Sequence, residues 1–162
     1  MAVPGSRGEP RGGARAAAAS GTWLGFDFGE RRIGVAVGEV SVGIANPLAT
    51  IAASANEARF DAIEKLVHEW KPAGFVVGLP RHADGAEHEV AKLAEKFGRR
   101  LAARYALPVA YVDETLSSAE AQSRLRGART RSQRKGDVDA LAAAIILQSW
   151  LDRPEAHGEA AS

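Results

Sequence analysis

The chain has 162 residues, of which 46% are hydrophobic, and a formal net charge of +1. These values fit one domain with a substantial core and leave no room for a second domain of any size. The chain contains no cysteine, which excludes disulfide frameworks, zinc ribbons and thiol nucleophiles. No apolar run approaches the roughly 20 residues of a membrane span, so we expect no membrane partner.

Both ends of the chain lack the apolar periodicity of a folded element. Residues 1–21 are rich in Ala, Gly and Arg, with Glu9 as their only acid, and their prolines and glycines oppose a stable helix. We therefore predict disordered tails over residues 1–21 and 153–162 and a folded domain over residues 22–152. An Arg-rich, acid-poor leader is also typical of an organellar transit peptide.

Three short apolar strands come first in the folded domain, over residues 22–28, 33–38 and 47–52. The first two are separated by Gly29, Glu30, Arg31 and Arg32, a spacing that predicts a hairpin. The third can extend the same antiparallel meander. We therefore expect a three-stranded meander at the start of the domain.

Helices and strands alternate after the meander. Ser54 and Glu57 form a capping-box pattern that opens an amphipathic helix, with Pro72 just past its end. A strand over 75–79, a helix over 87–105, a strand over 108–112 and a final helix over 137–151 follow, and a second capping box at Ser117 and Glu120 opens a short helix between the last two. This order predicts an α/β fold in which helices flank a mixed sheet.

Two acid sites lie at or beside strand ends. Asp27 lies in the apolar run 23–28, where a carboxylate without a partner would cost several kcal/mol; it could instead cap the turn at Gly29. Asp113 and Glu114 follow a predicted parallel strand. Open sheets carry ligands at that end of their strands, although acids also simply end strands there.

Asp139 is the third acid site and lies in the final predicted helix. Helical spacing places it on one face with Ala142, Ala143 and Ile146. We expect this face to pack on the sheet, with the two alanines allowing a close approach that brings Asp139 towards the strand acids. The alternative is a solvated first-turn acid stabilised by the helix dipole.

Three acid sites that converge would suit a hard divalent cation, Mg²⁺ or Mn²⁺. The four histidines show no zinc-site spacing; they are His68, His82, His88 and His157. A cation held by carboxylates activates water and neutralises charge on a scissile phosphate. The pattern therefore predicts a hydrolase that cleaves phosphodiester bonds with the help of a metal ion.

A basic segment fits such a substrate. Between Gln122 and Gly136 there is no acid, and the basic residues are Arg124, Arg126, Arg129, Arg131, Arg134 and Lys135. With Arg31 and Arg32 of the first turn, they are predicted to contact nucleic-acid phosphates, in single-stranded or structured RNA or in branched DNA. The alternative is an ordinary solvated loop.

Four blocks of the sequence, in this order, resemble the YqgF (RuvX) family. They are Leu24–Val37; Val76–Pro80 with Asp84-Gly85; Val112–Ser117; and Lys135–Ala143 with Ile146–Gln148. The resemblance spans residues 23–151. It implies an RNase H-like fold, related to the RuvC Holliday-junction resolvases, with a mixed five-stranded sheet.

The resemblance also implies a cytoplasmic nuclease that processes the 5′ end of pre-16S rRNA in ribosome biogenesis, acting as a monomer or a homodimer. A Holliday-junction resolvase acting on branched DNA is the alternative. Asp27, Asp139 and the pair Asp113-Glu114 match the family's catalytic acids. Asp27, Glu114 and Asp139 are the expected metal ligands, with Glu114 favoured over Asp113 because neighbours on a strand point to opposite faces.

The sequence departs from the family pattern in two places: Thr115 stands where Arg is more familiar, and residues 39–43 lack an Asp-Pro pair. Neither place includes an expected metal ligand. Two rival functions fit the sequence less well. An actin-like phosphotransferase needs two such domains, and a non-catalytic nucleic-acid-binding module would not need acids at all three sites.

Overall fold

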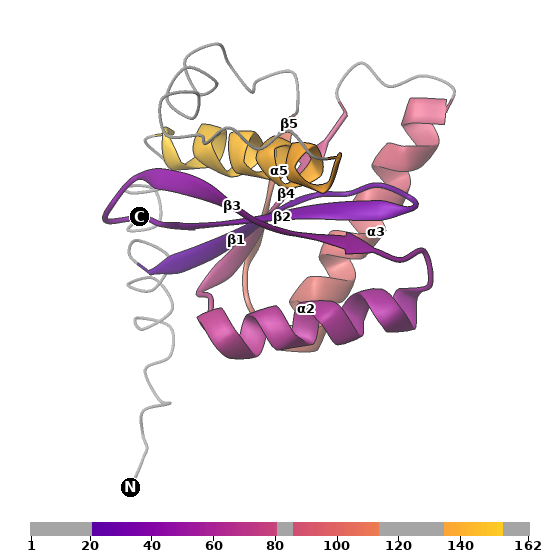
Figure 1. The fold of residues 1–162 in the computed structure, drawn as a ribbon, viewed down its shortest axis with the longest axis horizontal. Coiled ribbons are helices and arrows are strands. Elements are labelled where there is room, and N and C mark those ends of the chain that lie inside the picture. The colour runs from indigo at the N-terminus through magenta and orange to yellow at the C-terminus, as the bar shows by residue number, and fades with distance from the viewer. Residues whose placement is uncertain (1–20, 81–85, 114–134, 154–162) are drawn as a thin grey trace, which may run out of the picture.

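The structure is a computed structural model that describes residues 21–80, 86–113 and 135–153. Five strands in these residues form one sheet in the order β3-β2-β1-β4-β5 (Figure 1). They are β1 (Thr22–Asp27), β2 (Arg32–Glu39), β3 (Ile44–Ala52), β4 (Gly74–Leu79) and β5 (Val109–Asp113). The predictions for the tails, the second capping box and most of the basic segment concern residues outside the described ranges.

The sheet is mixed, as predicted. β1 pairs antiparallel with β2, and β2 pairs antiparallel with β3, which confirms the hairpin and the meander. β4 lies parallel to β1 and β5 lies parallel to β4. Consequently β1, β4 and β5 end at the same edge of the sheet, and the turn between β1 and β2 lies at that edge.

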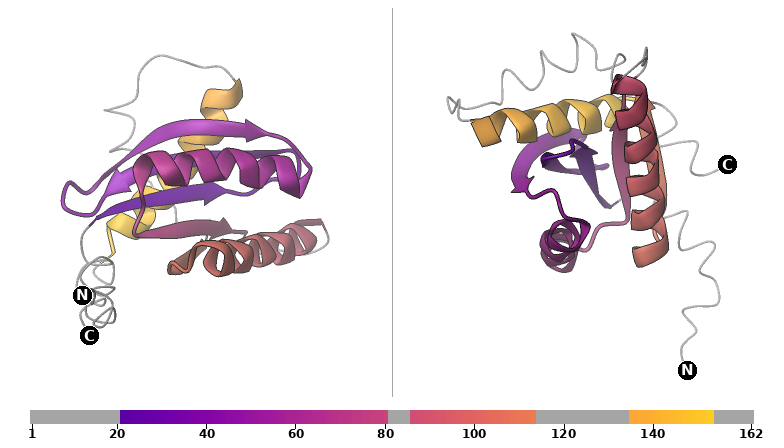
Figure 2. Two further views of the ribbon diagram at one scale, coloured as in Figure 1. Left: turned by 90° about the horizontal axis from the view of Figure 1, so that it is seen from below. Right: turned by 90° about the vertical axis from the view of Figure 1, so that its right-hand side faces the viewer.

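Helices cover both faces of the sheet (Figures 1 and 2). α5 (Lys135–Leu151) packs on one face, and α2 (Asn56–Trp70) and α3 (Ala86–Tyr105) pack on the other. Strand alternation separates the two cores: Trp23 belongs to the cluster beneath α5, whereas its neighbour Leu24 belongs to the cluster beneath α2 and α3.

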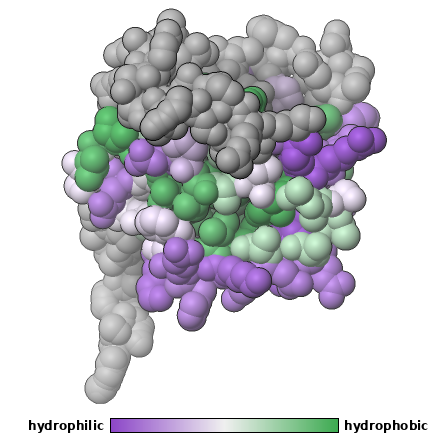
Figure 3. All heavy atoms as spheres, viewed as in Figure 1, coloured by the Kyte–Doolittle hydropathy of each residue, from purple (hydrophilic) through white to green (hydrophobic). Residues whose placement is uncertain are grey.

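The helices α2 and α3 are amphipathic, and hydrophilic side chains cover the outer face of α2 (Figure 3). The apolar faces of these helices include two residues that lie at the margin of the core: Trp70 is 36% exposed and Leu93 is 37% exposed. The predicted capping box of Ser54 and Glu57 is wrong. The N-cap of α2 is Ala55, one residue later, and no side chain caps the helix.

None of the helices in the described ranges combines the length and the apolar character that crossing a membrane requires.

Candidate active site

Asp27 is the last residue of β1 and faces α5. Strand alternation gives it the orientation of Gly25, and a Cβ atom at Gly25 would lie 2.7 Å from the Cβ of Leu147 in α5. Asp27 is half-buried and pairs in register with Gly34 of β2. The residue opposite Asp27 on the sheet is therefore a glycine that faces the same helix.

The first turn of α5 touches the sheet at this glycine. A Cβ atom at Gly34 would lie 1.9 Å from the carbonyl oxygen of Asp139, which is shorter than any real contact. The backbone of Asp139 thus packs directly on the strand position opposite Asp27. Asp139 was predicted to approach the strand acids. Its backbone contacts β2 at the register partner of Asp27, and Gly34 allows this contact.

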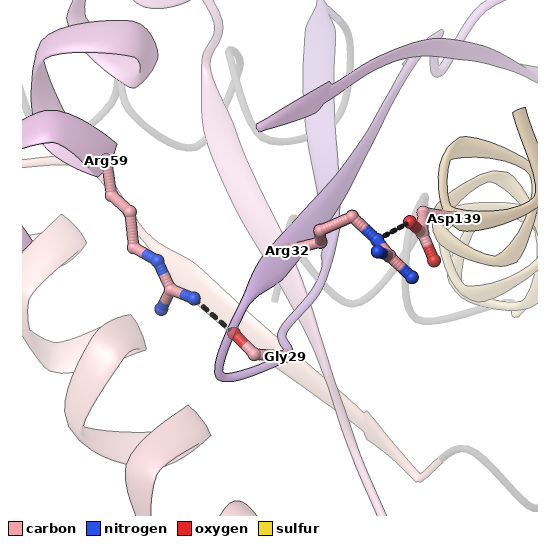
Figure 4. Close-up of polar contacts among 4 residues, drawn as sticks. All are labelled: Gly29, Arg32, Arg59 and Asp139. Carbon is pink, nitrogen blue, oxygen red and sulfur yellow. Dashed lines mark hydrogen bonds and ion pairs between the residues drawn. The ribbon is translucent and has the colours of Figure 1, made fainter. Parts of the chain in front are cut away.

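The side chain of Asp139 forms an ion pair with Arg32, the first residue of β2 (Figure 4). Nε of Arg32 donates to Oδ2 of Asp139 at 2.6 Å, and the two side chains are 41% and 24% exposed, respectively. Arg32, predicted to contact phosphate, is therefore bound to one of the predicted metal ligands.

Asp113 lies on the opposite face of the sheet from Asp27. Val112 packs in the cluster beneath α5, whereas Tyr111 reaches α3, where its hydroxyl lies 2.4 Å from the position of a Cβ at Gly98. Alternation gives Asp113 the orientation of Tyr111, and its register partner Leu79 belongs to the cluster beneath α2 and α3. Glu114 lies outside the described residues.

The predicted basic residues are placed only in part. Arg31 is exposed in the turn between β1 and β2, and Lys135 is the first residue of α5. Arg124, Arg126, Arg129, Arg131 and Arg134 lie outside the described residues. Among the described residues, no group of three or more His, Cys, Asp or Glu side chains is close enough to hold a metal ion. Glu114 is not among these residues.

Arg59 is a residue of the site region that the sequence analysis missed. It is only 3% exposed, and its Nη2 donates to the carbonyl of Gly29 at 2.6 Å (Figure 4). Its Nε donates to the carbonyl of Ala53 at 2.5 Å. Its guanidinium lies 5.2 Å from the ring centroid of Phe28. Burial lowers the pKa of Arg59, and the charge of Glu30 acts in the opposite direction. Arg59 therefore fastens the turn that follows Asp27.

The signal for Arg59 was present in the helical spacing of α2. Arg59 precedes Ile63 by four residues and Leu66 by seven, so it lies on the core-facing stripe of the helix. A charged residue on such a stripe needs polar partners inside the fold. Backbone carbonyls can supply them, and a sequence does not show where carbonyls point.

The matches to known proteins identify the family. A family model described as "RuvX: Holliday junction resolvase" matches residues 21–153. The chain belongs to the RuvX family. It is 56% identical to a protein of Dechloromonas aromatica named "Putative pre-16S rRNA nuclease", over 83% of this chain and 92% of that protein. A Neisseria gonorrhoeae protein with the same name is 53% identical, over 82% and 88% of the two chains.

Solved structures agree with this RuvX assignment at the level of the fold. The structure of T. thermophilus RuvC in complex with a Holliday junction substrate superposes with a TM-score of 0.56 at 18% identity, covering 80% of this chain and 93% of that one. The RNase H-like fold and the family predicted from the sequence are therefore confirmed. The names of the relatives agree with the predicted nuclease activity.

Proposed function

We propose that this RuvX-family protein is a nuclease that hydrolyses phosphodiester bonds at the 5′ end of pre-16S rRNA. The observation that carries the proposal is the contact of Asp139 with Gly34, the register partner of Asp27. It brings two acids from opposite ends of the folded domain to one edge of the sheet. Both are anchored on regular elements, as a reaction site requires.

Asp27, Asp139 and Glu114 would hold a Mg²⁺ or Mn²⁺ ion. The described donors fit such an ion, because carboxylate oxygens are the ligands that hard cations prefer. Asp113 ends its strand on the far face, so the next position along an extended chain would be on the face of Asp27. When bound, such an ion would acidify an attacking water and neutralise charge on the phosphate.

The chain's own residues have separate roles in this proposal. Asp27 and Asp139 orient the reaction centre from the sheet and from α5. Arg59 holds the turn between β1 and β2 through the carbonyl of Gly29, which keeps the end of β1 in place. Arg31 is exposed in that turn, where it could contact the phosphate backbone without reading base sequence.

RNA is the preferred substrate because the relatives with more than half of their residues identical are named for pre-16S rRNA. Branched DNA is the second candidate, and the description of the matching family model favours it. A junction resolvase needs two active sites set across a dimer, whereas an RNA-trimming enzyme can act as a monomer. The oligomeric state therefore helps to separate the two substrates.

The test compares Asp27→Asn and Asp139→Asn with a control, Asp61→Asn, which removes an exposed carboxylate from α2. Each is incubated with Mn²⁺ and either a 16S rRNA fragment carrying its 5′ precursor extension or a four-way DNA junction. We expect the two site variants to lose about 100-fold or more of the RNA cleavage, with binding retained, and the control to cleave like the wild type. Undiminished cleavage by either site variant would refute the proposed site.

The same assay decides between the substrates. Preferential cleavage of the RNA by a protein whose solution mass is that of a monomer supports the rRNA assignment. Symmetric cleavage of the junction by a dimer, with the RNA left intact, would replace it with the resolvase.

A further inference from the structure

Arg32 occupies a position that two different anions could share. It begins β2 at the edge of the sheet where β1 ends, and it has the strand orientation of Gly34, which faces α5. Its Nε atom is bound to Oδ2 of Asp139. This contact uses one of the five N–H donors of the guanidinium, so the group retains donors for a second acceptor.

A divalent cation and Arg32 would compete for Asp139. Both are positive, and a cation held by the Asp139 carboxylate would repel a guanidinium 2.6 Å from the same group. The existing pair is weak enough to be displaced, because its side chains are 41% and 24% exposed and exposed ion pairs contribute little. Cation binding would therefore release Arg32.

A released Arg32 would suit a phosphate. Its planar fork of donors matches two phosphate oxygens, and it would lie within the same edge of the sheet as Asp27 and Asp139. We propose that Arg32 alternates between Asp139 in the cation-free protein and a phosphate of the bound nucleic acid in the cation-loaded protein. This inference rests on the proposed function, and it adds a coupling between the two ligands.

The coupling has a definite sign. Since the cation frees Arg32 for the phosphate, cation binding strengthens nucleic-acid binding, and by thermodynamic linkage nucleic acid strengthens cation binding by the same factor. Loss of the Arg32 side chain removes a competitor of the cation and a ligand of the phosphate. The variant should therefore bind the cation more tightly and the nucleic acid less tightly.

The first experiment measures Mn²⁺ binding to the full chain by calorimetry without nucleic acid. We expect Arg32→Gln to bind Mn²⁺ about two- to fivefold more tightly than the wild type, the factor by which a weak ion pair can oppose binding. Arg31→Gln is the matched control, because it removes the same charge from the neighbouring exposed residue. It should change the affinity much less. Equal or weaker Mn²⁺ binding by Arg32→Gln would overturn the proposal.

The second experiment measures the coupling itself. Binding of a labelled single-stranded RNA is followed by fluorescence anisotropy with and without Ca²⁺, a hard cation with the same ligand preference, and a gel verifies that the RNA stays intact. The factor by which Ca²⁺ tightens binding should fall about fivefold in Arg32→Gln, within the usual range of coupling energies. It should persist in Arg100→Gln, which removes the same charge from an exposed position of α3. Arg32→Lys keeps a positive charge that competes with the cation for Asp139. It lacks the planar guanidinium, so it should lose the contact with two phosphate oxygens. An equal factor in all these proteins would overturn the proposal.

Failure of the proposed function gives a different result. If Asp139→Asn does not weaken Mn²⁺ binding, either in the wild-type background or in Arg32→Gln, the metal site itself is refuted. If Mn²⁺ binds and requires Asp139 but ignores Arg32, the metal site stands and the exchange of partners by Arg32 is refuted.

Discussion

The two faces of the sheet are packed in different ways. Beneath α5, two strand glycines let the helix approach the sheet closely, beside a pair of tryptophans whose ring centroids lie 4.3 Å apart. A Cβ at Gly25 would lie 2.7 Å from the Cβ of Leu147, and one at Gly34 would lie 1.9 Å from the carbonyl of Asp139. Beneath α2 and α3, aromatic rings fill the space, with the centroid of Phe26 5.9 Å from Phe75 and 5.4 Å from Phe97.

This difference in packing explains what holds the site in place. Bulky side chains can adopt new rotamers when a neighbour changes, whereas at Gly34 the backbone of α5 rests on strand backbone with no side chain between them to adjust. Asp27 and Asp139 lie on the tighter face. We therefore expect changes on the aromatic face to alter mainly stability, and changes at the glycine contacts to alter the site.

The largest expected effect on stability comes from Phe75→Ala on the aromatic face. Phe75 lies in β4, is fully buried, and pairs in register with Leu24 near the start of β1, away from Asp27. Truncating its side chain should cost about 3–5 kcal/mol of unfolding free energy. Urea denaturation measures this cost. The Mn²⁺ affinity of the folded variant, measured by calorimetry, should not change. Phe75→Leu, which should cost about 1 kcal/mol, repeats the test in a more stable background. Weakened Mn²⁺ binding in both variants would show that the two faces are not independent.

The next effect is that of Gly34→Ala on the tighter face. Its methyl group would displace the first turn of α5, at a cost of about 1–3 kcal/mol. Mn²⁺ affinity and cleavage should each fall about tenfold or more, because small displacements of a reacting group are costly.

Gly43→Ala is the matched control for Gly34→Ala. Gly43 lies between β2 and β3 with a φ of 79° and open space around its Cβ position. Alanine should destabilise the fold there through backbone strain, by about 1 kcal/mol, and leave Mn²⁺ binding intact. If the two variants weaken Mn²⁺ binding equally, the contact of α5 with Gly34 does not position the site.

The smallest expected effect is a pH dependence on the aromatic face. Tyr105 of α3 donates to Glu64 of α2 at 2.9 Å, and burial, followed by this hydrogen bond, raises the pKa of Tyr105 to about 12. A pKa raised in the folded state means stability that is present below the unfolded value of 10.0 and is lost as pH rises towards about 12.

Tyr105→Phe should therefore lower the unfolding free energy by about 0.5–1 kcal/mol at neutral pH, and its difference from the wild type should shrink between about pH 10 and 12. Urea denaturation across this pH range measures it. Glu64→Gln keeps an acceptor without the charge, so the pKa of Tyr105 should be raised less. The pH range over which stability is lost should therefore be narrower. A difference that does not vary with pH would show that the hydrogen bond is not linked to the ionisation of Tyr105.

Part of the site was predictable from the sequence because its signals are local. Apolar runs and their spacing predicted all five strands and the three helices of the described residues to within a few positions, and Asp27 was recognised because a carboxylate is out of place in an apolar strand. The alternation of side chains along an extended strand likewise predicted that the neighbours Asp113 and Glu114 do not share a face, and Asp113 lies on the face away from Asp27.

Other features were misjudged or missed because they depend on distant backbone. The close approach of α5 was attributed to Ala142 and Ala143 of the helix. Ala143 is fully buried against the sheet, but the space that Gly25 and Gly34 of the strands add was not recognised. Arg59 was not recognised because its partners are carbonyl oxygens. The capping box failed because α2 begins one residue later than its pattern indicates.

The sequence by itself determined the elements, the family and the candidate acids, since hydrophobic periodicity and motif spacing act over short stretches of chain. Only the tertiary structure decided which residues meet. Arg32 was expected to contact phosphate and is paired with Asp139, because α5 lies against the backbone of β2 at Gly34. Such a contact joins residues far apart in the chain, and its geometry follows from the packing of the whole sheet.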